Sequence, residues 1–406
     1  MIEDLLKLFD NILKKRYKVA IVSFSYPFQR PSVSGVGTHV YNLVTQLAKK
    51  RCEIHVFTSS EKDSIKKIRL GQGKIIIHFL KINFKFKIDN PIIKDRAKIA
   101  LFENKVLNEF ILEHLRRPFN IIHTHGWVTS SSFMVKHLYN VPWIHTLHAV
   151  ECNRLDNMTN EEKKISKIIN WLEETIIDAN KIICVSKKIQ KEANKHYPEI
   201  TTKTIVIPNG VDLRLFCPGK NDQKSILTIS RFSKEKGSHL LPEIIEEVLS
   251  KDKNSKYTVI MHDTNILELI EVKNKLLELQ KRFDKRFIWI KEPIYATELI
   301  KYYQNSGIYV QPSIYEAFGL CILESMACGN AVIATNIGGI PEFIGDSAIL
   351  VKPNPDCISK ALIKLLKNPA LINKYKKLSL ERAKKYDWPA IADQVLDVYK
   401  EQSTTN

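Results

Sequence analysis

The sequence lacks several features that mark membrane-spanning, secreted or zinc-binding proteins. Its seven cysteines are scattered and none form a C-x-x-C pair, which argues against a zinc site or a disulfide framework and favours a reducing compartment. No apolar stretch approaches the roughly 18 residues that a spanning helix needs. The N-terminus contains acidic residues and no long apolar region, unlike a secretory signal. Together these absences predict a cytoplasmic protein.

Motifs for nucleic-acid binding are also missing, although the formal net charge is +18. We find no RNP-like aromatic motif, no zinc-finger spacing and no basic region followed by heptads. The charge is compatible with a lysine-rich solvated surface, an anionic substrate or an anionic membrane face. It does not favour nucleic acid as a partner.

Length and composition indicate two globular domains. The chain has 406 residues, of which 44% are hydrophobic and 26% charged, too long for one ordinary core and too apolar for disorder. Short β-rich runs alternate with segments of helical periodicity, which predicts parallel sheets with helices on both faces. The runs are 19–23, 54–57, 75–79, 121–125, 143–147, 182–185 and 205–207, then 226–230, 257–261, 287–290, 308–310, 331–334 and 349–351.

A turn-forming cluster, 208–212 with Pro218 and Gly219, separates the two sets of runs. We therefore predict an α/β fold of two Rossmann-like, doubly wound domains that face each other across a cleft, with ligands at the carboxyl ends of the strands. The predicted domains are residues 1–214 and 215–385, followed by a final helix within 386–406.

Residues 2–16 have the periodicity of an amphipathic helix. Basic side chains lie close to its apolar face, at Lys7, Lys14, Lys15 and Arg16. Such a helix can dock on its own domain or attach to an anionic membrane surface, and both interpretations stay open.

The most informative segment is Glu316-Ala317-Phe318-Gly319-Leu320, with Glu324 following. We expect Glu316 in a loop, Phe318 to Leu320 at a helix start, and Glu324 within the first two turns. Amides at a helix start favour an anion, and a glycine lets a phosphate approach the backbone. Glu324 could accept ribose hydroxyls, and Glu316 could bind sugar hydroxyls or stabilise charge at an anomeric carbon. Alternatively, both are surface glutamates around a buried helix start.

A cationic pair, Arg231 and Lys236, directly follows the first strand of the second set. Both side chains could reach a diphosphate in the crevice and neutralise it as it leaves. A lysine-rich surface turn would look similar.

Two further groups lie in the first domain. Gly35 and Gly37 fall between the first strand and a helix predicted over 37–50, where a glycine-rich turn can approach phosphates, although any tight turn looks the same. His125 and His148 end β-rich runs, so they should face the crevice. No carboxylate has a spacing that suggests a metal site with these histidines, so no metal is expected.

The stretch 311–342, QPSIYEAFGLCILESMACGNAVIATNIGGIPE, resembles the signature of the retaining GT-B glycosyltransferases of the glycogen-synthase and sucrose-phosphate-synthase type, family 4. The similarity extends from about Tyr17 to the C-terminus. It implies that Glu316 lies by the transferred sugar, that Glu324 lies by the ribose, and that Arg231 and Lys236 bind the phosphates.

The resemblance also assigns roles in the first domain. It implies that His148 lies near the anomeric carbon, that His125 lines the cleft on the acceptor side, and that the glycine loop faces the donor. The final helix is expected to cross back onto the first domain. Glycines typical of the second domain are missing around 261–265 and 288–291, which leaves the nucleotide base open. No D-x-D, the metal–nucleotide motif of the other major glycosyltransferase fold, occurs.

These observations predict a retaining glycosyltransferase that moves a sugar from a nucleotide-diphosphate sugar to a hydroxyl acceptor, without metal or other cofactor. The acceptor could be a glycan, a small molecule, or an acidic or lipid-linked compound, the last met by peripheral attachment through residues 2–16. Two alternatives remain: a sugar-nucleotide epimerase or phosphorylase on the same fold, and a non-catalytic basic protein that binds RNA or a membrane.

Overall fold

The structure is a computed structural model that describes residues 16–26, 34–85, 87, 91–150, 174–262 and 269–404. The predicted helix over 2–16 lies outside the described residues. Within the described part of the chain, no helix combines the length and the apolar character needed to cross a bilayer.

The first domain is built on an eight-stranded sheet in the order β3-β4-β2-β1-β5-β6-β7-β8. All neighbouring strands pair in parallel except β3 and β4, which form an antiparallel hairpin at one edge. The strands are β1 Lys18–Val22, β2 Glu53–Ser60, β3 Ser64–Leu70, β4 Gly73–Lys81, β5 Ile121–His125, β6 Trp143–Leu147, β7 Lys181–Cys184 and β8 Thr204–Val206.

Four described α-helices cover this sheet: α2 Gly35–Lys49, α3 Pro91–Arg116, α4 Ser130–Tyr139 and α6 Lys187–His196. The sequence explains α2 well. Ser34 caps it by accepting a hydrogen bond from the Gly37 amide, and an i, i+3, i+4 stripe of apolar side chains is buried against the sheet. The helix begins at Gly35, two residues before the predicted start, because this cap draws both glycines into its first turn.

The second domain has a six-stranded sheet in the order β11-β10-β9-β12-β13-β14, parallel throughout. Its strands are β9 Asp222–Ile229, β10 Lys256–Ile260, β11 Phe287–Ile290, β12 Ser306–Gln311, β13 Ala331–Thr335 and β14 Ile349–Val351. Its helices are α7 Leu241–Lys251, α8 Ile270–Phe283, α9 Ala296–Asn305, α10 Leu320–Ala327, α11 Ile340–Ile344, α12 Pro355–Leu366 and α13 Pro369–Ala383.

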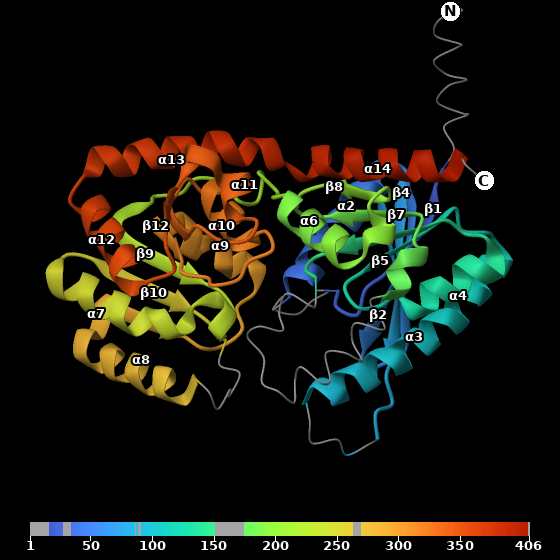
Figure 1. Cartoon of the computed structure of the whole chain (residues 1–406), viewed down its shortest axis with the longest axis horizontal. Coiled ribbons are helices and arrows are strands. Elements are labelled where there is room, and N and C mark those ends of the chain that lie inside the picture. Colours follow the sequence, from blue (N-terminus) through green and yellow to red (C-terminus); the bar gives the residue numbers. More distant parts are fainter. Residues whose placement is uncertain are drawn as a thin grey trace, which may run out of the picture.

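The last helix, α14 Trp388–Thr404, joins the two halves of the molecule. Figure 1 shows α13 on the second domain and α14 continuing along the same side to the first. The apolar face of α14 is buried in one core with α2 and β1. Gly210 lies so close to the Trp388 ring that a Cβ there would be 2.7 Å from it, and Val211 forms a β-bridge with Asp387. The chain therefore crosses between domains twice at the same place.

One strand was not predicted from the sequence. β3 forms the outer edge of the first sheet, and most of its side chains are exposed or half-buried. It consequently lacks the apolar run by which the buried strands were found.

Candidate active site

The loop over residues 312–319 joins β12 to α10 and ends in an unusual backbone conformation. Gly319 precedes α10 with φ of 108°, a region that only glycine occupies readily. A Cβ at this position would lie 2.9 Å from the Ile322 side chain. The positive end of the α10 dipole lies beside this glycine, as expected for an anion site.

Glu316 and Lys236 meet at this loop. The Lys236 Nζ donates to Glu316 Oε2 at 2.8 Å, and about 15% of either side chain is exposed. Lys236 lies in the 3₁₀ turn η4 Lys234–Lys236 that follows β9. The structure thus brings together two residues that the sequence assigned to separate clusters.

The 312–319 loop is fixed by backbone contacts on both sides. The Ile314 and Tyr315 amides donate to the Glu235 carbonyl at 2.8 and 3.0 Å. Gly237 packs so tightly that a Cβ would lie 1.9 Å from the Pro312 oxygen, and a Cβ at Gly338 would lie 1.8 Å from the Glu316 oxygen. The segment that carries Glu316 is therefore clamped between η4 and the loop before α11.

Arg231 differs from Lys236 in its surroundings. Its side chain is 55% exposed and lies 3.5 Å from the Glu235 carboxylate. It is therefore an exposed cation next to the η4 turn, whereas Lys236 is largely buried and paired with Glu316.

Glu324 lies beneath the surface. It is buried on α10, and its Oε2 accepts a 2.9 Å hydrogen bond from the Tyr303 hydroxyl of α9. Burial raises the pKa of Glu324 to about 7, because an ionised carboxylate loses favourable hydration. The alternative of two surface glutamates is therefore wrong for this residue.

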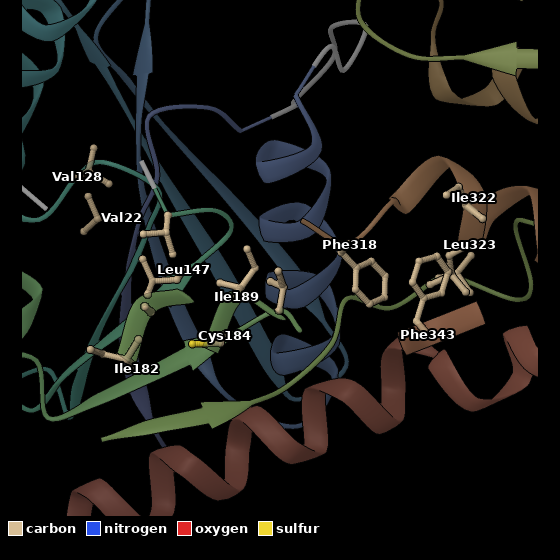
Figure 2. Packing of buried hydrophobic residues seen from close by; sticks show 14 of the residues in the cluster. Val22, Val128, Leu147, Ile182, Cys184, Ile189, Phe318, Ile322, Leu323 and Phe343 are labelled. Carbon is tan, nitrogen blue, oxygen red and sulfur yellow. The ribbon is translucent and has the colours of Figure 1, made fainter. Parts of the chain in front are cut away.

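Phe318 can offer only its backbone to a ligand, because its side chain is buried. Its ring stacks on Phe343 with centroids 4.5 Å apart, as Figure 2 shows. Both rings belong to one buried cluster that also includes Ile189 and Cys184 of the first domain. The start of α10 is thus anchored by apolar packing close to the junction of the two domains.

The two predicted glycines of the first domain are placed differently. A Cβ on Gly35 would be 3.7 Å from the Leu320 side chain, so the α2 start faces the α10 start across the domains. Gly37 is buried inside α2, so Gly35 is the glycine whose contact with the second domain is seen. The expectation of a glycine loop ahead of the helix is corrected accordingly.

His125 and His148 lie together at the ends of β5 and β6. His125 Nδ1 is 3.3 Å from His148 Nε2, and His39 of α2 joins them, with its ring centroid 4.7 Å from that of His148. Burial lowers the pKa of each of the three rings, to about 4 for His39. All three are therefore neutral at physiological pH, and each keeps a nitrogen lone pair.

These three histidines form the one group among the described residues that could hold a metal ion, with ligand atoms within 4.8 Å of one another. His39 Nδ1 lies 2.7 Å from the Asn209 side-chain oxygen and so carries its proton. The Nε2 atoms of His39 and His125 are buried without a hydrogen-bond partner in the described structure. The predicted absence of a metal requirement stays a prediction.

A cavity of about 250 Å³ lies between the two domains next to this loop. Lys188, Ile189 and Glu192 of α6 line it from the first domain, and Tyr315, Glu316 and Gly338 are among its residues from the second. The loop that carries Glu316 forms part of the cavity wall, and none of the three histidines lines it.

Sequence reasoning overlooked several partners of the site residues. His39 follows Gly35 in a G-x-x-x-H spacing and Asn209 lies in the turn cluster 208–212, but neither spacing foretells that the two side chains meet. Tyr303 stands in no recognisable spacing with Glu324, which it contacts. For contacts between site residues, the strand ends gave a usable signal, because carboxyl ends of parallel strands meet at one edge.

Two family models of glycosyltransferases match the chain. The family model described as "Glycosyl transferases group 1" matches residues 217–386, and the model described as "Glycosyltransferase Family 4" matches residues 33–215. The chain is 23% identical to the D-inositol 3-phosphate glycosyltransferase of Corynebacterium efficiens, covering 95% of this chain and 96% of the relative.

Solved structures resemble it over nearly their whole length. Sucrose-phosphate synthase from Thermosynechococcus elongatus superposes with a TM-score of 0.80 at 21% identity, over 96% of this chain and 100% of that one. Anabaena HepE in complex with UDP and glucose superposes with a TM-score of 0.68 at 14% identity, over 95% and 100%.

Proposed function

This chain belongs to the group 1, family 4 glycosyltransferases, and from that premise we propose that it transfers a sugar from a nucleotide-diphosphate sugar to a hydroxyl acceptor with retention at the anomeric carbon. Its GT-B fold of two facing domains supplies the cleft in which donor and acceptor would meet. The Lys236–Glu316 pair beside the start of α10 is the observation that carries the proposal, since it joins a cation and a carboxylate at a site suited to a diphosphate.

In the proposed complex, Lys236 and the more exposed Arg231 neutralise the diphosphate, aided by the amides from Ala317 to Leu320 at the positive end of α10. Glu316 is released from part of its ion pair as the phosphates arrive and then accepts hydroxyls of the sugar. Glu324 accepts a ribose hydroxyl with the carboxylate that Tyr303 already orients.

The proposed reaction is a front-face substitution. The bond between the anomeric carbon and the diphosphate oxygen breaks, and the acceptor oxygen bonds to the same face of that carbon. The acceptor proton passes to the departing phosphate oxygen. Positive charge at the anomeric carbon is stabilised by Glu316, and His148, with His125 beside it, orients the sugar from the first domain.

We infer that the acceptor is acidic or lipid-linked. The enzyme would reach it at the cytosolic face of an anionic membrane, to which residues 2–16 attach. Exposed apolar side chains support this on the outer faces of α3 and α4, at Leu112, Leu115 and Leu138, with the exposed Arg116 beside them. The two helices lie side by side at one end of the molecule (Figure 1).

The test is a thermal-shift panel of nucleotide sugars, starting with UDP-glucose because one structural neighbour holds UDP and glucose. The donor that binds is then incubated with a cell extract, and products are identified by mass spectrometry and anomeric NMR. Turnover that requires an acceptor and keeps the donor's anomeric configuration supports the proposal. Acceptor-independent conversion, a phosphate requirement or inversion contradicts it.

A further inference from the structure

The N-terminus of α6 belongs to the first domain but contacts the second domain at two points. The Ser186 hydroxyl, which caps α6 by accepting from the Ile189 amide at 3.2 Å, also donates to the Ala317 carbonyl at 3.0 Å. The next amide, of Lys187, donates to both carboxylate oxygens of Glu342, at 3.0 and 2.8 Å. We call these four residues the α6 contact.

The α6 contact is favourable electrostatically. A carboxylate at a helix N-terminus interacts with the positive end of the dipole and with an amide that has no partner inside the helix. Here the helix lies in one domain and the carboxylate in the other, so this stabilisation exists only while the two domains hold their present arrangement. A charge-assisted bond of this kind is about twice as strong as a neutral one.

Ser186–Ala317 and Lys187–Glu342, the two halves of the α6 contact, each involve a segment that touches Glu316. Ala317 is its direct neighbour, and the Gly339 amide, three residues before Glu342, donates to the Glu316 carbonyl at 3.0 Å. A Cβ on Gly339 would lie 2.2 Å from the Ala317 oxygen and 3.0 Å from the Ser186 hydroxyl. Gly339 therefore sits in direct contact with both Ser186 and the 312–319 loop, and there is no room for a larger residue between them.

The backbone that carries the Glu342 carboxylate is held by α13 on the side away from α6. Arg382 of α13 donates to the Glu342 carbonyl at 3.0 Å and to the Phe343 carbonyl. Phe343 in turn stacks on Phe318 of the loop. A displacement of α6 thus reaches the loop through the Ser186 hydroxyl and the Glu342 carboxylate, both of which contact backbone groups held on their far side.

We propose that Ser186 and Glu342 are positioning residues of the transfer reaction: from opposite domains, they set the 312–319 loop so that Glu316 and the α10 start hold the donor. The inference rests on the proposed function for what the loop binds, but the coupling between α6 and the loop stands on the contacts alone. It follows that docking of the domains further restrains a loop that is already clamped within the second domain, and that a nucleotide bound to the second domain stabilises the start of α6 in the first.

Hydrogen–deuterium exchange of the full chain tests the coupling without any ligand. Glu342→Ala should speed exchange at residues 187–190 and also at 314–320, where no hydrogen bond to Glu342 is lost. Asp393→Asn is the matched control, because it breaks the 2.6 Å Lys50–Asp393 ion pair between α14 and the first domain and leaves the loop untouched. If exchange at 314–320 stays at the wild-type rate in Glu342→Ala, the proposal is overturned.

Glu342→Gln covers the case in which the alanine variant does not fold. It keeps one oxygen acceptor and loses the charge, so loop exchange should rise by less than in the alanine variant. A folded glutamine variant with loop exchange equal to that of wild type would likewise contradict the proposal.

Ser186→Ala addresses the positioning of the donor. The Kd for the nucleoside diphosphate chosen from UDP, GDP and ADP should rise about fivefold, the effect of losing one hydrogen bond of ordinary strength, and kcat should fall. The control is Asn354→Ala, which removes the side-chain cap of α12 but no bond between domains. An equal change in Kd in both variants would assign the effect to stability and refute positioning.

Failure of the two ideas can be told apart. If wild-type protein binds none of these nucleotides, the proposed function fails, while the ligand-free exchange of Glu342→Ala still decides whether α6 orders the loop. If nucleotide binds but slows exchange at 187–190 equally in wild type and Glu342→Ala, the proposed function survives and the α6 contact does not transmit binding.

Discussion

Lys236 donates a 2.8 Å hydrogen bond to Glu316, a residue 80 positions further along the chain. Neither side chain is more than about 15% exposed, so each partly desolvated charge depends on the other. A bound diphosphate would compete for Lys236 and release the carboxylate. The ion pair therefore neutralises both charges while no ligand is bound, and it provides the cation for a departing diphosphate and the carboxylate for a developing positive charge.

Replacing either partner should abolish transfer while the protein stays folded. For Lys236→Ala and Glu316→Ala we expect kcat to fall about 100- to 1,000-fold, the usual cost of removing one electrostatic group from a transition state. Circular dichroism checks the fold, and Lys360→Ala is the control, because it breaks an exposed helix ion pair of the same domain. Near-wild-type turnover in either site variant would remove these residues from the mechanism.

Glu324 should make the protein less stable as pH rises, whereas a salt-bridged carboxylate makes a protein more stable as pH rises. Its folded pKa is raised from 4.5 to about 7, so between these values the native state binds more protons than the unfolded state. The free energy of unfolding therefore falls as pH rises through this window and levels off above it.

Glu324→Gln should remove this dependence, gaining up to about 3 kcal/mol relative to wild type between pH 5 and 8. Urea unfolding at several pH values measures the difference in the free energy of unfolding between the two proteins. Other titrating groups, such as Glu103, are present in both proteins and cancel in this difference. Parallel pH curves for the two proteins would mean that Glu324 ionises normally.

The first sheet illustrates what sequence can reveal. Its buried strands were found because each is an apolar run, and β5 and β6 even have the predicted bounds. The exposed edge strand β3 has no such run. The start of α2 was placed two residues late, since the Ser34 cap outweighs the low helix propensity of Gly35 and Gly37.

Contacts within the site were harder to foresee than its members. The strand ends predicted that His125 and His148 lie at the same edge of the first sheet. In the structure, His125 Nδ1 is 3.3 Å from His148 Nε2. The contact of His39 with these two histidines depends on how α2 packs on the sheet, which the spacing of His39 from Gly35 does not encode. The same holds for Tyr303 below Glu324 and for Glu342 at the start of α6: these partners are set by packing between elements and domains.

Transfer should not need a divalent metal, and excess zinc should inhibit it. EDTA is expected to leave the rate unchanged, because the proposed chemistry neutralises the diphosphate with Lys236 and Arg231. Zinc should bind the neutral imidazoles of His39, His125 and His148, which suit this ion. Loss of activity in EDTA that magnesium or manganese restores would contradict the first expectation.

The zinc expectation has a readout independent of activity. Cobalt(II) should give visible d–d absorption with the wild-type protein and a much weaker band with His39→Gln, which lacks one ligand. His239→Gln, in the second domain and outside the group, is the control. Identical spectra for all three proteins would show that the three histidines do not act as ligands.

Removing residues 1–15 should release the enzyme from anionic vesicles if they attach it to a membrane. Cosedimentation with phosphatidylglycerol vesicles, compared with neutral phosphatidylcholine vesicles, measures this, and turnover of a water-soluble acceptor should be unchanged. Equal vesicle binding by both proteins would assign attachment to another surface, of which the exposed leucines of α3 and α4 are the first to be substituted.

The clamp on the 312–319 loop can be tested with two glycines that have nearly the same positive φ but different surroundings. Gly71 has φ of 60° and Gly338 has φ of 57°. A Cβ on Gly71 would meet no atom within 4 Å, whereas one on Gly338 would lie 1.8 Å from the Glu316 carbonyl. Alanine at either position has the same left-handed strain, about 1–2 kcal/mol, so the comparison isolates the steric contact.

We expect Gly71→Ala to lose only this strain energy and to keep full activity. Gly338→Ala must also displace the backbone at Glu316, since a carbonyl oxygen cannot rotate away as a side chain does. Its unfolding free energy should therefore fall further, and at a temperature where it remains folded its kcat should fall at least tenfold. Equal stability and equal activity of the two variants would mean that the loop yields to a methyl group, and a loop that soft could not hold Glu316 against the diphosphate.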